Sequence, residues 1–378
     1  MRKAVLIVLS VLLVSCGQKA QQSGSSTIQK SPAVTEQTGR FAIAPQFSNS
    51  SHFAEGLAAV RVGSGEAARW GFIDTQGKMA INPQFDFADA FSDGLAAVRM
   101  GKGNAGKWGF VDKQGKLVID AQFDFASSFA DGLAAVRTGD YKTGKWGFID
   151  KQGTMVINPQ FDHVNLFADG LAAVRIGRGK AAKWEYIDKQ GNIALAAQVS
   201  YADSFSGGLA AVRIAKGRDA KLGYIDKQGR IVIKPQFDEG VAFSDGLAAV
   251  RVGNERSGKW GFIDTQGKMV IKPQFDDCFS FSEGMASVQI GHGRAAKWGF
   301  IDKQGKLIDS RFDSEGVFMS GLAAVRIGNE RSGKWGFIDK QGKQVISPRF
   351  AEIGPFTEGL AAVRVRDKKN ASWGYISR

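Results

Sequence analysis

The sequence predicts an all-β protein in which nine tandem units, each of three strands, form a propeller-like ring closed by the termini. Three observations lead to this fold class: tryptophan recurs at a fixed period, each period contains three runs suited to strands, and the chain begins and ends partway through a unit. Composition agrees, because 48 Gly and 27 Phe among 378 residues indicate many turns and aromatic contacts.

The period is set by tryptophan. All eight tryptophans fall on one lattice with steps of 38 residues, apart from one step of 37, and Leu222 takes the vacant place. The decamer KWGFIDKQGK occurs identically at 297–306 and 334–343. Such regularity is typical of a building unit rather than of scattered ligand sites. We therefore interpret the tryptophans as structural packing residues: Trp70, Trp108, Trp146, Trp184, Trp260, Trp298, Trp335 and Trp373.

One unit shows the three strand runs most clearly. They are GLAAVRV at 246–252, KWGFID at 259–264 and KMVIKPQF at 268–275. Between the second and third runs, Asp264 and Gly267 predict a hairpin turn in which the carboxylate accepts a backbone hydrogen bond and the glycine takes a positive φ. Eight copies keep both residues, and we interpret the carboxylates as turn formers rather than metal ligands. The glycine after each Trp is expected to give a neighbouring sheet room to approach.

At this point the unit resembles the WG repeat, a bacterial repeat family. Its signature is Trp-Gly followed by F-I-D-x-x-G, then an apolar strand, P-x-F and F-x-x-G-L-A-x-V. The resemblance covers residues 40–378 and implies a repeat architecture without implying an activity. Two adjacent units depart from the signature: Trp184-Glu185-Tyr186 lacks the glycine and the later P-x-F, and the next unit has Leu222-Gly223. We expect a distorted sheet or a specialised surface at 184–223.

The phase of the two ends predicts how the ring closes. Residues 41–47 (FAIAPQF) correspond to a third strand, and residues 373–377 (WGYIS) to a second strand. The termini would then complete one shared sheet and leave no bare sheet edge. An open β-solenoid is the alternative. Solenoids usually need terminal capping units of atypical sequence, whereas the terminal units of this chain match the others in sequence.

The N-terminus predicts export and lipid anchoring. Residues 1–15 begin with a basic pair and continue with an apolar run, as signal peptides do. The tetrad LVSC that ends at Cys16 resembles the lipobox of bacterial lipoproteins. By that resemblance Cys16 carries the lipid, and Gly17 fits an outer-membrane destination; a plain secretory signal is the alternative.

The segment after the signal predicts a tether. Residues 16–38 are rich in Gln, Ser and Thr and too poor in apolar side chains to order themselves, so the β-repeat domain is expected at 39–378. The other cysteine, Cys278, then has no disulfide partner and is interpreted as a small buried apolar residue.

The loop between the first and second strand runs is the variable part of the unit. Eight of its nine versions carry net positive charge, within a chain of net charge +13. Equivalent loops should emerge on one face, where they would attract acidic polymers or anionic lipid headgroups; lysines that merely solvate exposed loops are the alternative. The candidate basic rim consists of Lys102, Lys142, Arg178, Lys180, Lys216, Arg218, Arg256, Arg294, Arg331, Lys368 and Lys369.

An arginine ends the first strand run in eight units, and Gln289 replaces it in the ninth. The hairpin should bring this arginine close to the next tryptophan, so stacking of guanidinium on indole is our structural interpretation. A ladder of ligand-binding arginines is the alternative. The eight are Arg61, Arg99, Arg137, Arg175, Arg213, Arg251, Arg326 and Arg364.

No catalytic chemistry is predicted. His52, His163 and His292 fall at unrelated points of the repeat, and no metal-ligand spacing, G-x-S-x-G or phosphate-cradling loop occurs. We therefore expect no catalytic residue, no cofactor and no metal, with a cryptic propeller-type hydrolase as an alternative. Nucleic acid is not an expected partner, because an exported lipoprotein does not meet chromosomal DNA and no recognition motif is present.

The functional prediction is a binding or scaffold protein. It would be lipid-anchored in the bacterial cell envelope and would present its basic loops to proteins or acidic envelope polymers. A purely structural or assembly role without a dedicated ligand is the alternative.

Overall fold

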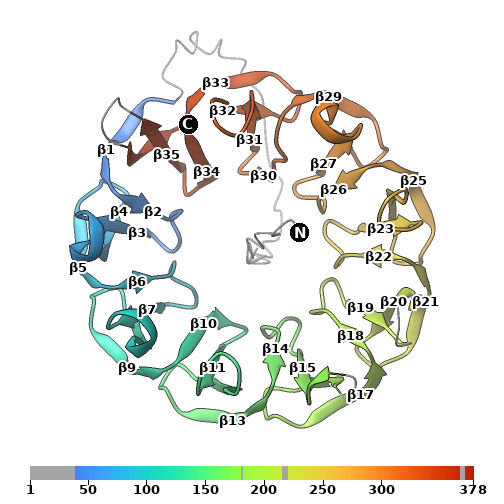
Figure 1. Cartoon of the computed structure of the whole chain (residues 1–378), viewed down its shortest axis with the longest axis horizontal. Coiled ribbons are helices and arrows are strands. Elements are labelled where there is room, and N and C mark those ends of the chain that lie inside the picture. Colours follow the sequence, from blue (N-terminus) through green and yellow to red (C-terminus); the bar gives the residue numbers. More distant parts are fainter. Residues whose placement is uncertain (1–38, 180–181, 215–219, 367–370) are drawn as a thin grey trace, which may run out of the picture. The chain divides into compact units, whose positions relative to one another are not determined.

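The computed structural model describes residues 39–179, 182–214, 220–366 and 371–378, and these form a nine-bladed β-propeller. Each blade is a four-stranded antiparallel sheet, and the sheets follow one another around a ring (Figure 1). We number the blades 1 to 9 in chain order, with blade 1 made of β2 to β5. The expected ring is confirmed, while the expected three strands per unit are corrected to four.

The fourth strand is short and innermost, which is why the sequence did not reveal it: in most blades it pairs over two residues only. The inner strands are β2 (Asn49–Ser50), β6 (Phe87–Ala88), β10 (Phe125–Ala130), β14 (His163–Val164), β18 (Tyr201–Ala202), β22 (Glu239–Gly240), β26 (Asp277–Cys278), β30 (Phe318–Met319) and β34 (Glu352–Thr357). Figure 1 shows them lining the inside of the ring.

The other three strands correspond to the three sequence runs. The second strands are β3 (Leu57–Val62), β7 (Ala96–Met100), β11 (Leu133–Thr138), β15 (Ala172–Ile176), β19 (Leu209–Arg213), β23 (Ala248–Val252), β27 (Met285–Ile290), β31 (Leu322–Ile327) and β35 (Leu360–Arg366). The third strands are β4 (Arg69–Asp74), β8 (Lys107–Val111), β12 (Lys145–Ile149), β16 (Lys183–Ile187), β20 (Leu222–Asp226), β24 (Lys259–Ile263), β28 (Lys297–Asp302), β32 (Lys334–Asp339) and β36 (Ala371–Ser377). The outer strands are β5 (Met79–Phe85), β9 (Leu117–Phe123), β13 (Met155–Phe161), β17 (Ile193–Val199), β21 (Ile231–Phe237), β25 (Met269–Phe275), β29 (Leu307–Phe312), β33 (Gln344–Phe350) and β1 (Phe41–Phe47).

The termini close the ring as the sequence predicts. Blade 9 takes its outer strand from the N-terminal part of the chain: β1 pairs antiparallel with β36, and Ile43 lies opposite Tyr375. Blade 9 is also bonded to blade 1, because the Tyr375 hydroxyl donates to the Ser51 carbonyl at 2.8 Å and the Gly56 N–H donates to the Glu358 carboxylate at 3.0 Å. The ring is therefore closed, with blade 9 in contact with blade 1.

Packing between blades depends on a pair of aromatic rings that recurs around the whole ring. The ring two residues after each Trp position stacks at an angle on a phenylalanine that follows the next inner strand; in blades 6 and 7 these are Phe262 and Phe281, 4.8 Å apart. Both side chains are at most 1% exposed. Equivalent pairs join all nine blades, and Tyr375 with Phe53 completes the circle.

Two turn and strand features explain the glycines of the unit. In the predicted hairpin turn, Asp264 accepts hydrogen bonds from the backbone N–H of Gln266 and Lys268, and Gly267 has φ +80°, which confirms the interpretation. The glycine after Trp has a different role from the one expected. A Cβ on Gly261 would lie 2.5 Å from the Ile271 carbonyl oxygen, so the glycine makes room for the outer strand of its own blade rather than for a neighbouring sheet.

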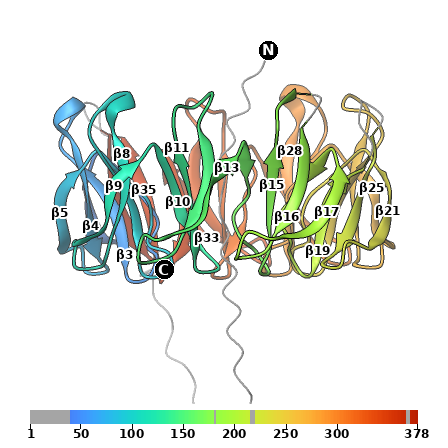
Figure 2. The ribbon, with the colours of Figure 1, turned by 90° about the horizontal axis from the view of Figure 1, so that it is seen from below.

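The loops between second and third strands, as far as the structure describes them, lie along one edge of the ring, which we call the loop face. Three of them contain short 3₁₀ turns: η1 (Gly65–Ala67), η2 (Gly103–Ala105) and η4 (Gly293–Ala295). Figure 2 shows the loops along the upper edge and the turns between third and outer strands along the lower edge, which we call the turn face. The expectation that the variable loops share one face is thereby confirmed.

Candidate functional site

In six of the nine variable loops the last basic residue forms an ion pair with an aspartate of the protein. Lys183 and Lys334, at the same position in two further loops, are exposed and make no ion pair with a described residue. In blade 3, Lys145 forms an ion pair of 2.9 Å with Asp162, which follows the outer strand. Asp162 also accepts hydrogen bonds from the backbone N–H of Gly177 and the side chain of Arg178 in the next blade. The hydrogen bonds from Lys145 and Arg178 lower the pKa of Asp162 to about 2. These pairs connect neighbouring loops, and they recur at Lys107 with Asp124, Lys221 with Asp238, Lys259 with Asp276 and Lys297 with Asp313.

The candidate basic rim therefore divides into several groups. Arg178 is paired with Asp162, and Lys102 lies 3.1 Å from Glu66 in an exposed pair. Lys142, Arg256 and Arg331 are exposed and make no ion pair with any described residue. Lys180, Lys216, Arg218, Lys368 and Lys369 lie outside the described residues, as do the side chain of Arg294 and the proposed lipidation site, Cys16.

The tryptophans fall into two groups by burial. Trp70, Trp108, Trp184 and Trp298 are 7–8% exposed. Trp146, Trp260, Trp335 and Trp373 are only half-buried. The more completely buried rings are those of the phenylalanines and tyrosines two residues further along, which carry the contact between blades.

Below the loops, each blade has a row of side chains that we call the Arg–Trp layer. In blade 3 the inner-strand residue Phe125 lies opposite Arg137, Arg137 opposite Trp146, and Trp146 opposite Phe161. The guanidinium carbon of Arg137 is 5.6 Å from the Trp146 ring centre. Arg251 with Trp260 and Arg326 with Trp335 show the same arrangement at 5.9 and 5.6 Å, so the predicted stacking is confirmed in these three units.

In blades 6 and 9 the Arg–Trp layer contains its own counter-charges. The inner-strand position opposite the arginine is Glu239 in blade 6 and Glu352 in blade 9. The Glu239 carboxylate binds Arg213 of the preceding blade at 3.0 Å and Arg251 of its own blade at 3.6 Å. Glu352 pairs with Arg364 of its own blade. In blade 7 an aspartate, Asp277, lies opposite the glutamine that replaces the arginine, and Arg326 of blade 8 makes no ion pair with a described residue.

In blades 2 to 5 the same position is aromatic, and we call this side of the layer the aromatic arc. The four residues are Phe87, Phe125, His163 and Tyr201. They alternate with the tryptophans: Phe125 lies 5.2 Å from Trp108 of the preceding blade and 5.5 Å from Trp146 of its own. Partial burial and the charge of Arg175 lower the pKa of His163.

Three arginines of the aromatic arc have no acidic partner. Arg99, Arg137 and Arg175 are half-buried, and each has a buried Nε that makes no hydrogen bond within the described part of the chain, as is also true of Arg251, Arg326 and Arg364. None of the three forms an ion pair with a described residue. A guanidinium that is partly removed from water and left without a counter-ion favours binding of an external anion. The sequence offered a signal that we did not use, namely the change from aromatic to acidic residues two positions after the P-x-F phenylalanine.

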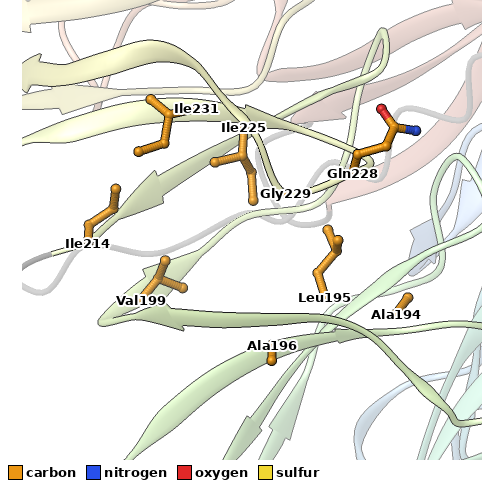
Figure 3. A pocket seen from close by; sticks show the side chains of 9 residues that line it. All are labelled: Ala194, Leu195, Ala196, Val199, Ile214, Ile225, Gln228, Gly229 and Ile231. Atoms are coloured by element: carbon orange, nitrogen blue, oxygen red, sulfur yellow. The ribbon is translucent and has the colours of Figure 1, made fainter.

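The degenerate units contain a groove of about 450 Å³ between blades 4 and 5 (Figure 3). Val199 stands where the other units have phenylalanine. A Cβ placed on Gly229 would lie 3.3 Å from Leu195, where most other units have an isoleucine at 2.9–3.2 Å. The lining is apolar apart from Gln228 and contains no ionisable side chain. The expected specialised surface at 184–223 is thus an apolar groove, formed where smaller side chains replace larger ones. It contains no side chain suited to acid–base chemistry.

The described residues show no grouping of three or more His, Cys, Asp and Glu side chains that could hold a metal ion. They also contain no helix long and apolar enough to cross a membrane. Cys278 is half-buried, and burial raises the pKa of its thiol.

The fold defines the class of protein: it is a β-propeller whose variable loops lie on one face, the loop face. The chain belongs to the family described as WG containing repeat. Nine matches cover residues 36–64, 70–103, 108–141, 146–180, 186–216, 223–255, 260–291, 298–330 and 335–368.

Solved structures share the fold at low sequence identity. A eukaryotic initiation factor is similar over 89% of this chain and 92% of its own, with 13% identity and a TM-score of 0.58. Dipeptidyl peptidase 4 of Porphyromonas gingivalis is similar over 87% of this chain and 65% of its own, with 11% identity and a TM-score of 0.50. No curated protein sequence matches. Likeness at these identities concerns the fold alone.

Proposed function

We propose that the protein is a non-catalytic binding scaffold, anchored by lipid at Cys16 in the cell envelope, whose loop face binds an acidic envelope polymer. The observation that carries this proposal is the set of half-buried arginines without acidic partners in blades 2 to 4, together with the exposed loop cations Lys142, Arg256 and Arg331 on the same face of the ring. The regular closed ring supports a scaffold role, because loops of equivalent position present their charges together on one face.

The binding proposal is tested with washed envelope fractions and the purified propeller. Lys142→Glu, Arg256→Glu and Arg331→Glu together should weaken binding, and binding of the unaltered protein should fall steeply with added salt. The matched control is Lys116→Glu, Lys151→Glu and Lys189→Glu, which makes the same change of charge on the turn face without breaking an ion pair between described residues. Equal losses from both variants would mean that the charge acts diffusely. Binding that is insensitive to salt would favour a purely structural role.

The anchoring proposal predicts that Cys16→Ser releases the protein into the soluble fraction with its thermal unfolding unchanged, since the described fold begins only at residue 39. Stable anchoring needs several acyl chains. Because the substitution removes the attachment site for all of them, release from the membrane should be complete. Metabolic labelling with a palmitate analogue makes the measurement. An unlabelled wild-type protein would contradict the proposal.

A further inference from the structure

We propose that the aromatic arc is the ligand-contacting part of the loop face and that it binds a linear polysaccharide bearing a carboxylate on its sugar rings. This inference rests on the proposed function and assigns the residues and the ligand class. The contacts would come from Arg99, Arg137 and Arg175 in three consecutive blades, with Phe125 and His163 between them.

The protein itself shows what this layer binds. At the equivalent place between blades 5 and 6, the Glu239 carboxylate is held by Arg213 at 3.0 Å and by Arg251 at 3.6 Å. An internal carboxylate thus bridges the arginines of two neighbouring blades. In the aromatic arc the same pairs of arginines occur, but the intervening inner-strand residues are Phe125 and His163. In blade 3 the Phe125 ring fills the position of Glu239, 5.8 Å from the guanidinium carbon of Arg137, so a carboxylate from outside would reach the arginines beside the aromatic ring rather than in its place.

Repetition indicates a polymer. The sites between blades 2 and 3 and between blades 3 and 4 are copies of one arrangement, so a ligand that satisfies both must carry at least two carboxylates in series. A polysaccharide with an acid on its sugar rings holds successive charges on a stiff chain, which lowers the entropy lost on binding. An acidic polypeptide carries its carboxylates on flexible side chains and loses more entropy when they are fixed.

The aromatic side chains favour sugar rings over nucleic acid bases. Phe125 and Tyr201 are 38% and 39% exposed, whereas Trp108 behind them is 7% exposed. Neighbouring rings are tilted, with angles of 44° between Trp108 and Phe125 and 66° between Phe125 and Trp146. Tilted rings that cover one another leave no open face on which a base can stack. They do leave an apolar surface against which the C–H groups of a sugar can pack.

The test measures binding of a fluorescently labelled oligogalacturonate to the whole propeller by anisotropy. Arg99→Gln, Arg137→Gln and Arg175→Gln together should weaken binding by about tenfold or more, since each loses a charge-assisted contact. Lys116→Gln, Lys151→Gln and Lys189→Gln remove the same charge from the turn face and should leave binding unchanged. The methyl-esterified oligomer, which has the same backbone without the charge, should not bind.

A second variant tests the mechanism without removing an arginine. His163→Glu places a carboxylate where Glu239 lies in blade 6, so Arg137 and Arg175 gain an internal partner. Ligand binding should fall by about tenfold, while the melting temperature stays equal or rises because His163 is exposed in the native protein. Unchanged ligand affinity in this variant would contradict the assignment of the carboxylate positions.

The remaining outcomes are equally decisive. Tighter binding of poly-glutamate or of oligo-thymidylate than of oligogalacturonate would overturn the ligand class. Failure of every polyanion to bind would overturn the inference entirely. If the arginine variant keeps its affinity while the loop-face variant loses envelope binding, the inference is wrong and the proposed function stands.

Discussion

Deleting residues 371–378 is expected to unfold or aggregate the protein cooperatively, although the deletion removes only the last strand. That strand, β36, lies between β35 and β1, and β1 pairs with no other strand. Its loss removes Tyr375 and Ile376, both fully buried, whose truncation alone should cost roughly 5–10 kcal/mol. This is comparable with the whole stability of an ordinary domain.

The deletion also separates blade 9 from blade 1. It removes the hydrogen bond from Tyr375 to Ser51 and the packing of Tyr375 on Phe53, whose ring centre lies 4.9 Å away. Hydrogen exchange on the truncated chain should therefore show reduced protection at residues 41–62, far away in the sequence. A reduction confined to residues 345–370 would instead describe a ring that tolerates opening. Tyr375→Phe is the matched control and should cost only about 1 kcal/mol, because it removes one hydrogen bond.

The sequence alone predicted the ring because its information is local and repeated. The Asp264 turn and the Arg137–Trp146 pair follow from spacing within a hairpin, the closing of β1 on β36 follows from the phase of the repeat at the two ends, and each is confirmed. The inner strand escaped prediction since two paired residues leave no period-two pattern to read. The sequence also could not show that Gly261 makes room for the outer strand of its own blade. That contact depends on a register shift between the third and outer strands, which is visible only in the structure.

The candidate site was only partly predictable. The loop charges were visible in the sequence, but not the position of Asp162, which binds Lys145 of its own blade and Arg178 of the next. The aromatic arc depends on the inner strand, so its residues had no assigned neighbours before the fold was known. Arg99 and Arg251 look equivalent within their own strand runs, and only the inner strand of each blade shows that Arg99 faces Phe87 whereas Arg251 faces Glu239.

Burial predicts that the phenylalanine of each WG unit matters more for stability than the tryptophan after which the repeat is named. Phe262 is 0% exposed and packs against Phe281 of the next blade at 4.8 Å. Phe262→Ala should therefore lower the free energy of unfolding by roughly 3–5 kcal/mol, through reduced burial and an unfilled cavity between two blades. The denaturant midpoint should fall with little change in the m-value.

Trp260→Ala in the same strand supplies the comparison. Trp260 is half-buried, and its ring faces Arg251 at 5.9 Å rather than the centre of the blade interface. Its removal should cost roughly 1–2 kcal/mol, from a partly screened cation–π contact and incomplete burial. Phe262→Leu keeps most of the volume and should cost less than Phe262→Ala, which separates the cavity from the loss of the ring pair. If Trp260→Ala proves as damaging as Phe262→Ala, the cohesion between blades lies in the Arg–Trp layer, and the arginines of the aromatic arc would then be needed for stability rather than left for a ligand.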